Sequence, residues 1–236
     1  MKARCLSLVY LTCRAACSTS LQRGSWQDGR YGFRRCIVNS CLWTYQGRSD
    51  GIVTSPCLRT LDGDEWLRRS VFIGSVLSGV LRIIHPDQYR AGMEVMRSMR
   101  RSILENRCLS RWPSVFNAIT LISDRHCPMH RDSGGAFYLY DMLISVGSYT
   151  SAPMCLMPLG VQVRNSPGTV VAFSGSAIRH GVAEADGHRI CHALYMRESL
   201  HRYCGVQPCG WMTQDCFAPW IGKYHEYTRR AVIKTI

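Results

Sequence analysis

The stretch that decides the fold lies between residues 115 and 197, where residues 126–135 read HCPMHRDSGG and residues 165–197 read NSPGTVVAFSGSAIRHGVAEADGHRICHALYMR. Side chains alternate between the two faces of a β-strand, so His130 and Asp132 point to one side and Arg131 to the other. The first segment therefore predicts an imidazole beside a carboxylate. Because a His-x-Asp spacing arises easily by chance among eight histidines, the second segment has to supply the structural context.

That context is a second histidine and an arginine in a fixed order. Turn residues 165–168 precede the β-branched and aromatic run 169–173, and a further turn leads to His180. An alternating strand beginning with Arg189 follows. The order is typical of the two-histidine, one-carboxylate triad of non-haem Fe(II) oxygenases. We interpret the whole stretch as a double-stranded β-helix built around a metal site.

The chemistry accounts for each residue type. His130, Asp132 and His180 would bind one face of Fe(II) and leave three positions for a bidentate 2-oxo acid and O2. A guanidinium fork matches a carboxylate, so we predict that Arg189 binds the far carboxylate of 2-oxoglutarate. Other histidines and arginines remain open as replacements, namely His126, His188 and His192 for a ligand, and Arg179 and Arg197 for the arginine.

Composition indicates one globular domain with extensions, since 46% of the 236 residues are hydrophobic. The net charge of +13 suggests a polyanionic partner, although residues 1–61 alone carry nine basic and two acidic residues. The thirteen cysteines include no Cys-x-x-Cys and indicate free thiols in a reducing compartment. A zinc site remains an alternative for the residues His201, Cys204, Cys209, Cys216 and His225.

We predict an α+β fold: a jelly-roll or cupin-like double-stranded β-helix with N-terminal helices packed on its major sheet. One helix should begin at Asp62 and a second at Pro86, with Trp66, Val71, Phe72, Val76, Val80, Leu81 and Ile84 on the buried face of the first and Tyr89, Met93, Met96 and Met99 on that of the second. We expect a poorly ordered basic extension at 1–50, the catalytic domain at 51–207 and a tail at 208–236. We expect no membrane span, but the N-terminus leaves secretion or mitochondrial targeting open.

These residues resemble the TET/JBP family of Fe(II)- and 2-oxoglutarate-dependent dioxygenases, in particular its short members from basidiomycete fungi. The resemblance covers roughly residues 52–207. It rests on residues 54–59 (TSPCLR), 63–69 (GDEWLRR), 116–122 (FNAITLI), 130–132 (HRD), 166–182 and the strand at Arg189. It implies oxidation of the methyl group of 5-methylcytosine, or of thymine, in double-stranded DNA whose target base is flipped out. A nuclear location follows from that expectation.

The resemblance also suggests roles for single residues. His130, Asp132 and His180 match the iron ligands and Arg189 the cofactor arginine, while Tyr195 matches an aromatic residue of the base pocket. Arg125 and Asn117 are candidates for substrate or cofactor contacts, and Arg197 is a candidate for a substrate contact. Independently of the resemblance, Arg100 and Arg101 at the end of the second helix are candidates for phosphate contacts, the alternative being a solvated face that compensates the helix dipole.

Two departures from the family leave base identity open. Gly135 stands where some relatives have a polar residue that reads the base, and Arg197 stands where some have a histidine. Two alternatives to the predicted function therefore remain. One is the same chemistry on methylated adenine or a protein side chain, and the other is a catalytically inactive relative that binds nucleic acid.

Overall fold

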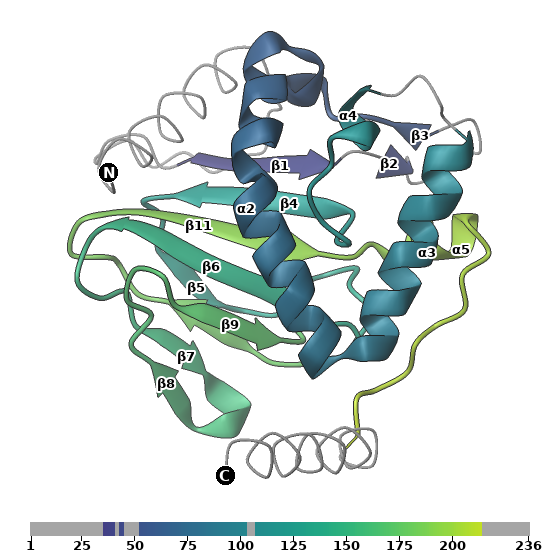
Figure 1. The fold of residues 1–236 in the computed structure, drawn as a ribbon. Helices are drawn as coiled ribbons and strands as arrows, with labels where there is room; N and C mark the ends of the chain where they lie inside the picture. The colour runs from purple at the N-terminus through teal and green to yellow at the C-terminus, as the bar shows by residue number, and fades with distance from the viewer. Residues whose placement is uncertain (1–34, 41–42, 45–51, 103–106, 214–236) are drawn as a thin grey trace, which may run out of the picture.

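The computed structural model describes residues 35–40, 43–44, 52–102 and 107–213, and its centre is a pair of facing antiparallel sheets (Figure 1). The five-stranded major sheet has the spatial order β1 (Arg35–Ser40), β4 (Ala118–Ser123), β11 (His188–Tyr195), β6 (Asp141–Ser148) and β9 (Val170–Phe173). The four-stranded minor sheet has the order β5 (Cys127–His130), β10 (His180–Val182), β7 (Met154–Leu156) and β8 (Val161–Val163). From β4 to β11 the chain passes from one sheet to the other after each strand, except within the β7–β8 hairpin of the minor sheet, as in a double-stranded β-helix.

Two helices cover the outer face of the major sheet (Figure 1). The first, α2 (Leu61–Ile84), is capped by Thr60, whose hydroxyl accepts the Gly63 N–H at 3.1 Å. It ends at His85 because Pro86 opens α3 (Pro86–Ser102). The shorter elements are β2 (Trp43–Thr44), β3 (Ile52–Val53), η1 (Pro56–Arg59), α4 (Arg107–Ser110), η2 (Met157–Leu159) and α5 (Glu198–Tyr203).

The hydrophobic residues form two clusters, one on each side of the major sheet. Between that sheet and the helices, Leu77 and Leu81 of α2 and Met96 of α3 pack against Met142 and Leu194 of the strands. Between the two sheets lies a smaller cluster that includes Met154, Leu156, Phe173 and Val182. The larger cluster fixes the major sheet against the helices, and the smaller cluster packs the two sheets together.

The predicted fold class and the two N-terminal helices are confirmed. The buried face of the first helix is confirmed in part, since Trp66 and Leu81 lie in the core and Val80 and Ile84 pack against it. Val71, Phe72 and Val76 are 47%, 77% and 42% exposed. Gly63, Ser70, Gly74 and Ser78 are buried in their place. Small residues allow the helix to approach its neighbours closely, and hydrophobicity alone could not reveal which side does so.

Two boundaries also differ from the expectation. Residues 35–40, which we assigned to a poorly ordered extension, form β1 and pair with β4 along their whole length. The cap of α2 is Thr60 instead of Asp62, and Glu65 forms ion pairs with Arg68 and Arg69. Strand β1 was not predicted because it is stabilised by pairing with β4, a strand that is distant in the sequence.

Candidate metal and cofactor site

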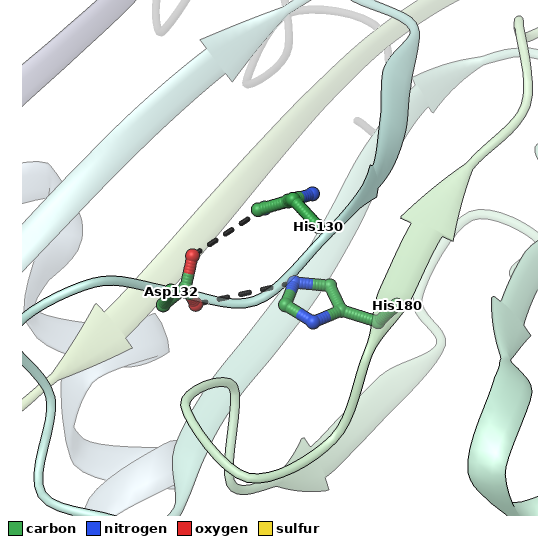
Figure 2. A group of neighbouring side chains, drawn as sticks. All are labelled: His130, Asp132 and His180. Carbon is green, nitrogen blue, oxygen red and sulfur yellow. Dashed lines mark ion pairs between the residues drawn. The ribbon is translucent and has the colours of Figure 1, made fainter.

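Three predicted ligand side chains come together at one end of the minor sheet (Figure 2). Asp132 Oδ1 lies 3.4 Å from His130 Nε2, and Asp132 Oδ2 lies 3.9 Å from His180 Nε2. The three ligand atoms all lie within 4.8 Å of one another, and no other such group of potential ligands occurs among the described residues. Two imidazole nitrogens and a carboxylate at this separation can converge on one metal ion.

Both imidazoles are held in the orientation that a metal requires. His130 Nδ1 lies 2.7 Å from the carbonyl oxygen of Pro128, and His180 Nδ1 lies 2.9 Å from that of Ile178. A carbonyl can only accept, so each Nδ1 carries the proton and each Nε2 presents a lone pair to the site. Burial lowers the pKa of His180, although the Ile178 carbonyl and Asp132 oppose that shift. The neutral, metal-binding form of His180 is therefore favoured.

Strand pairing explains why residues fifty positions apart meet. His180 of β10 is the direct cross-strand partner of His130 of β5, and the register shifts between His180 and Val182. Such an irregularity is a β-bulge, which bends a strand and redirects its side chains. The sequence gives no sign of the bulge because its cause is the pairing itself.

A second carboxylate lies beside the predicted ligand Asp132. Asp141, the first residue of β6, accepts the Gly175 N–H at 3.0 Å through Oδ2. Burial, followed by the neighbouring charge of Asp132, raises the pKa of Asp141 to about 7. The ligand carboxylate therefore has an acidic neighbour that the sequence analysis did not single out.

Arg189 is a buried cation on the inner face of β11, with only 3% of its surface exposed. Its Nε donates to the Ser145 hydroxyl at 3.2 Å and its Nη1 to the Arg125 carbonyl at 3.5 Å. No acidic side chain in the described part of the chain forms an ion pair with this guanidinium. A buried guanidinium with neutral partners alone is costly, so the pocket suits an anionic ligand.

Two of the triad residues, His130 and Asp132, are exposed, whereas His180 and Arg189 are buried. The Cys127 thiol lies within electrostatic range of both Arg189 and Asp132, and burial raises the pKa of that thiol.

A comparison with protein families identifies this arrangement. The model of Tet_JBP, the oxygenase domain of the 2OGFeDO superfamily, matches residues 43–198, more than half of the chain. The chain belongs to this family. It is therefore an oxidoreductase of the 2-oxoglutarate- and Fe(II)-dependent dioxygenase superfamily, as its sequence predicted. The Nε2 lone pairs, the Asp132 carboxylate and the buried Arg189 fit the iron and 2-oxoglutarate that this superfamily uses.

Solved structures resemble the Tet_JBP domain in fold. NgTET1, solved in complex with 5mC DNA, is 14% identical with a TM-score of 0.53, and the match covers 83% of this chain and 69% of that one. A Cupin 2 conserved barrel domain protein from Salinispora arenicola is 12% identical with a TM-score of 0.29 over 37% of this chain and 69% of that one, too slight to bear on the fold. No curated protein matches the chain.

The candidate base-pocket residues form one polar unit at the end of β11. Arg197 Nη2 donates to the Tyr195 hydroxyl at 3.3 Å, and the guanidinium carbon lies 5.5 Å from the Tyr195 ring centroid. Asn117 is buried, and its side-chain carbonyl accepts the Arg197 N–H at 2.8 Å. Because Leu194 pairs with Met142, Tyr195 lies at the same end of the major sheet as Asp141.

The other predicted residues lie apart from the triad. Arg125 contributes its carbonyl to Arg189, and Arg100 is exposed on α3, where it lines a cavity of about 650 Å³ with Arg97 and Cys204. The side chain of Arg101 lies outside the described residues. Of the spare histidines, His126 is exposed, His188 approaches Asp124 at 3.5 Å, and His192 is buried with its pKa lowered to about 4 by burial.

The alternative zinc site finds no support in the described region. His201, Cys204 and Cys209 do not form a group with metal-binding separations there, and Cys216 and His225 lie outside the described residues. No helix in the described ranges is long and apolar enough to cross a bilayer.

The sequence analysis missed Asp141, Ser145, Gly175 and Asp124. Ser145 is the direct cross-strand partner of Cys191, two residues after Arg189. Asp124 accepts the Arg189 N–H at 2.7 Å. Strand alternation places Ser145 and Asp141 on one face of β6, but only the register of β6 against β11 shows which residues they face.

Proposed function

We propose that this Tet_JBP oxygenase oxidises the methyl group of 5-methylcytosine, or of thymine, in DNA. The observation that carries the proposal is that one Tet_JBP domain holds both the His130–Asp132–His180 triad and a buried Arg189 that forms no ion pair with an acidic side chain of the described residues. NgTET1, which shares the fold, was solved with 5mC DNA. That DNA complex supports the choice of substrate.

In this proposal His130, Asp132 and His180 hold Fe(II), and Arg189 with Ser145 holds the far carboxylate of 2-oxoglutarate. Bound together, the iron and 2-oxoglutarate supply the oxidising chemistry: one O2 and one 2-oxoglutarate yield succinate, CO2 and a hydroxylated methyl group. The carbonyls of Pro128 and Ile178 keep the protons on the two Nδ1 atoms throughout, so the imidazoles remain neutral ligands.

The surface around the triad supports a nucleic-acid substrate. Because β7 ends beside His180, the β7–β8 hairpin tip lies at the triad end of the minor sheet, and Met157 N–H donates to the Arg179 carbonyl at 3.0 Å. At this tip Met157 is 61% exposed, Leu159 57% and Val161 45%. Apolar side chains of this kind wedge between base steps in proteins that distort a duplex.

Two exposed arginines accompany the apolar hairpin tip. Arg179 precedes His180 and Arg131 follows His130, and both are exposed at the ends of neighbouring strands. Arginines at these places can bind the phosphates on either side of an extruded base. The apolar tip and the two arginines together suit a duplex from which one nucleotide turns toward the triad.

The Tyr195–Arg197 unit is the proposed contact for that base. The Tyr195 ring offers a stacking face, and the Arg197 guanidinium can donate to the acceptors on a pyrimidine edge. Gly135 leaves room beside the triad, since a Cβ there would approach only Ser176, at 3.5 Å. No side chain therefore occupies the position where some relatives have a residue that reads the base.

The test supplies Fe(II), 2-oxoglutarate and O2 to the purified protein with DNA containing 5-methylcytosine, thymine or N6-methyladenine. Mass spectrometry follows succinate and oxidised bases together. Succinate with hydroxymethylcytosine or hydroxymethyluracil is the expected result. Succinate with oxidised adenine, or with no oxidised base, would assign the chemistry to another substrate, and the absence of succinate would favour a non-catalytic DNA-binding role.

We further propose that the protein acts in the nucleus, because its proposed substrate is genomic DNA. Fluorescence microscopy of the full chain with a C-terminal tag would test this. Secretion or import into mitochondria would refute it and would redirect the substrate search.

A further inference from the structure

Asp132, the proposed carboxylate ligand, follows the end of β5 and lies in a loop, so its direction needs an external support. The support visible in the backbone is Gly175, in the turn after β9. The Asp132 N–H donates to the Gly175 carbonyl at 3.0 Å, and the Gly175 N–H in turn donates to Asp141 Oδ2 at 3.0 Å. The ligand is thus connected to Asp141 by two hydrogen bonds through one residue.

Asp141 is itself fixed by the major sheet. It is the first residue of β6 and the direct cross-strand partner of Phe173, which is buried between the two sheets. Phe173 also packs its ring edge-on against His180, with centroids 4.7 Å apart. Because Asp141 is held in the major sheet, its hydrogen bond with Gly175 fixes the loop that carries Asp132 relative to that sheet.

Gly175 is the point where the two carboxylates converge. A Cβ on Gly175 would lie 2.6 Å from Asp141 Oδ2 and would overlap Asp132 Oδ2, closer than real Cβ atoms approach a neighbour. The position therefore requires glycine because of close approach, and any side chain there would displace one carboxylate.

We propose that Asp141 is a positioning residue that sets the direction of Asp132 for metal binding, acting through Gly175. This inference rests on the proposed ligand role of Asp132. Asp141 acts as a hydrogen-bond acceptor for Gly175 N–H and does not itself bind the metal. Partners behind a metal ligand of this kind typically change metal affinity by about 10- to 100-fold when removed.

The experiment measures Mn(II) binding to the metal-free full chain by electron paramagnetic resonance, with no turnover required. Asp141→Ala removes the acceptor and should weaken Mn(II) binding about 10- to 100-fold. Asp141→Asn keeps an acceptor oxygen and should restore the affinity to within about threefold of the wild type, a rescue that a purely electrostatic role would not allow. Gly175→Ala leaves both carboxylates in the sequence but should also weaken binding, because its Cβ would displace Asp132 and Asp141 from the positions they hold around Gly175.

The matched control is Asp186→Ala. Asp186 likewise accepts backbone N–H groups, from Thr150 at 2.8 Å and Ser151 at 3.3 Å, but next to the opposite end of β6. Its loss should leave Mn(II) affinity unchanged. Circular dichroism melting of each metal-free variant separates lost folding from lost metal binding.

The outcomes distinguish a failure of the triad assignment from a failure of the positioning role of Asp141. If the wild type binds no Mn(II), the assignment of the triad fails and this inference fails with it. If the wild type binds and a folded Asp141→Ala binds equally well, only the positioning role is overturned. If Asp141→Ala does not fold, the other two variants decide. The positioning role is overturned if Gly175→Ala binds Mn(II) as tightly as the wild type, or if Asp141→Asn binds it 10-fold or more weakly than the wild type.

Discussion

Replacing Arg189 with methionine should separate cofactor binding from stability. Methionine has a similar length and no charge, so it fills the space of a side chain that is 3% exposed. If Arg189 holds the far carboxylate of 2-oxoglutarate, the variant loses one partner of a buried charge pair. Such a loss costs about 2–5 kcal/mol, which corresponds to a rise in the KM for 2-oxoglutarate of roughly 30- to 5,000-fold.

The metal-free protein should respond differently. The variant loses the hydrogen bonds to Ser145 at 3.2 Å and the Arg125 carbonyl at 3.5 Å. These losses cost about 1.5–3 kcal/mol each, but they are offset by the several kcal/mol that burying an uncompensated charge costs the wild type. The free energy of unfolding should therefore change by no more than about 2 kcal/mol in either direction.

Two assays test this pair of expectations. Succinate formation over a range of 2-oxoglutarate concentrations gives KM, and urea unfolding of the metal-free protein gives the free energy of unfolding. Arg164→Met, at an exposed arginine, serves as the control and should change neither quantity. A folded Arg189→Met with a KM within about threefold of the wild type would refute the assignment, because less than 1 kcal/mol would then separate them.

Three further predictions concern the ligands, the DNA surface and pH. His130→Ala or Asp132→Ala should abolish succinate formation, and activity retained by either variant would remove that residue from the triad. Leu159→Ser at the exposed hairpin tip should lower oxidation of DNA about 10-fold without changing DNA-independent 2-oxoglutarate decarboxylation. Phe72→Ser, at a still more exposed site on α2, is the control and should change neither activity. An equal loss of DNA oxidation in the Leu159→Ser and Phe72→Ser variants would count against a role of the hairpin in DNA binding. Burial holds the pKa of His192 at about 4, so its contribution to stability is complete above about pH 6.5 and is lost as pH falls toward 4. Between pH 7 and 4 the wild type should therefore lose about 3 kcal/mol more unfolding free energy than His192→Leu, and parallel pH curves would contradict this.

Local sequence patterns predicted both helices, but only part of the buried face of the first one. Pro86 and the inward methionines placed α3 correctly, since Met96 and Met99 are buried. For α2 the apolar residues indicated the buried face only in part: Leu81 is buried as predicted, but Phe72 is exposed, and Ser78 is buried and donates to the Gly74 carbonyl. A serine can be buried when its hydroxyl donates to a backbone carbonyl of its own helix. A pattern of apolar residues at helical spacing does not reveal such a buried serine.

The sequence by itself determined the chemistry of this protein: which residue types could hold a metal and a dicarboxylate, in which order, and in which family. Those properties are local, because the His-x-Asp spacing, the turns and the arginine strand follow from side-chain alternation and residue type. The residues that support the site could be identified only from the tertiary structure. Ser145 meets Arg189, and Asp141 meets Asp132 through Gly175, because of strand register and backbone approach between segments that are distant in sequence. Register is set by the packing of the whole sheet, so no single segment carries that information.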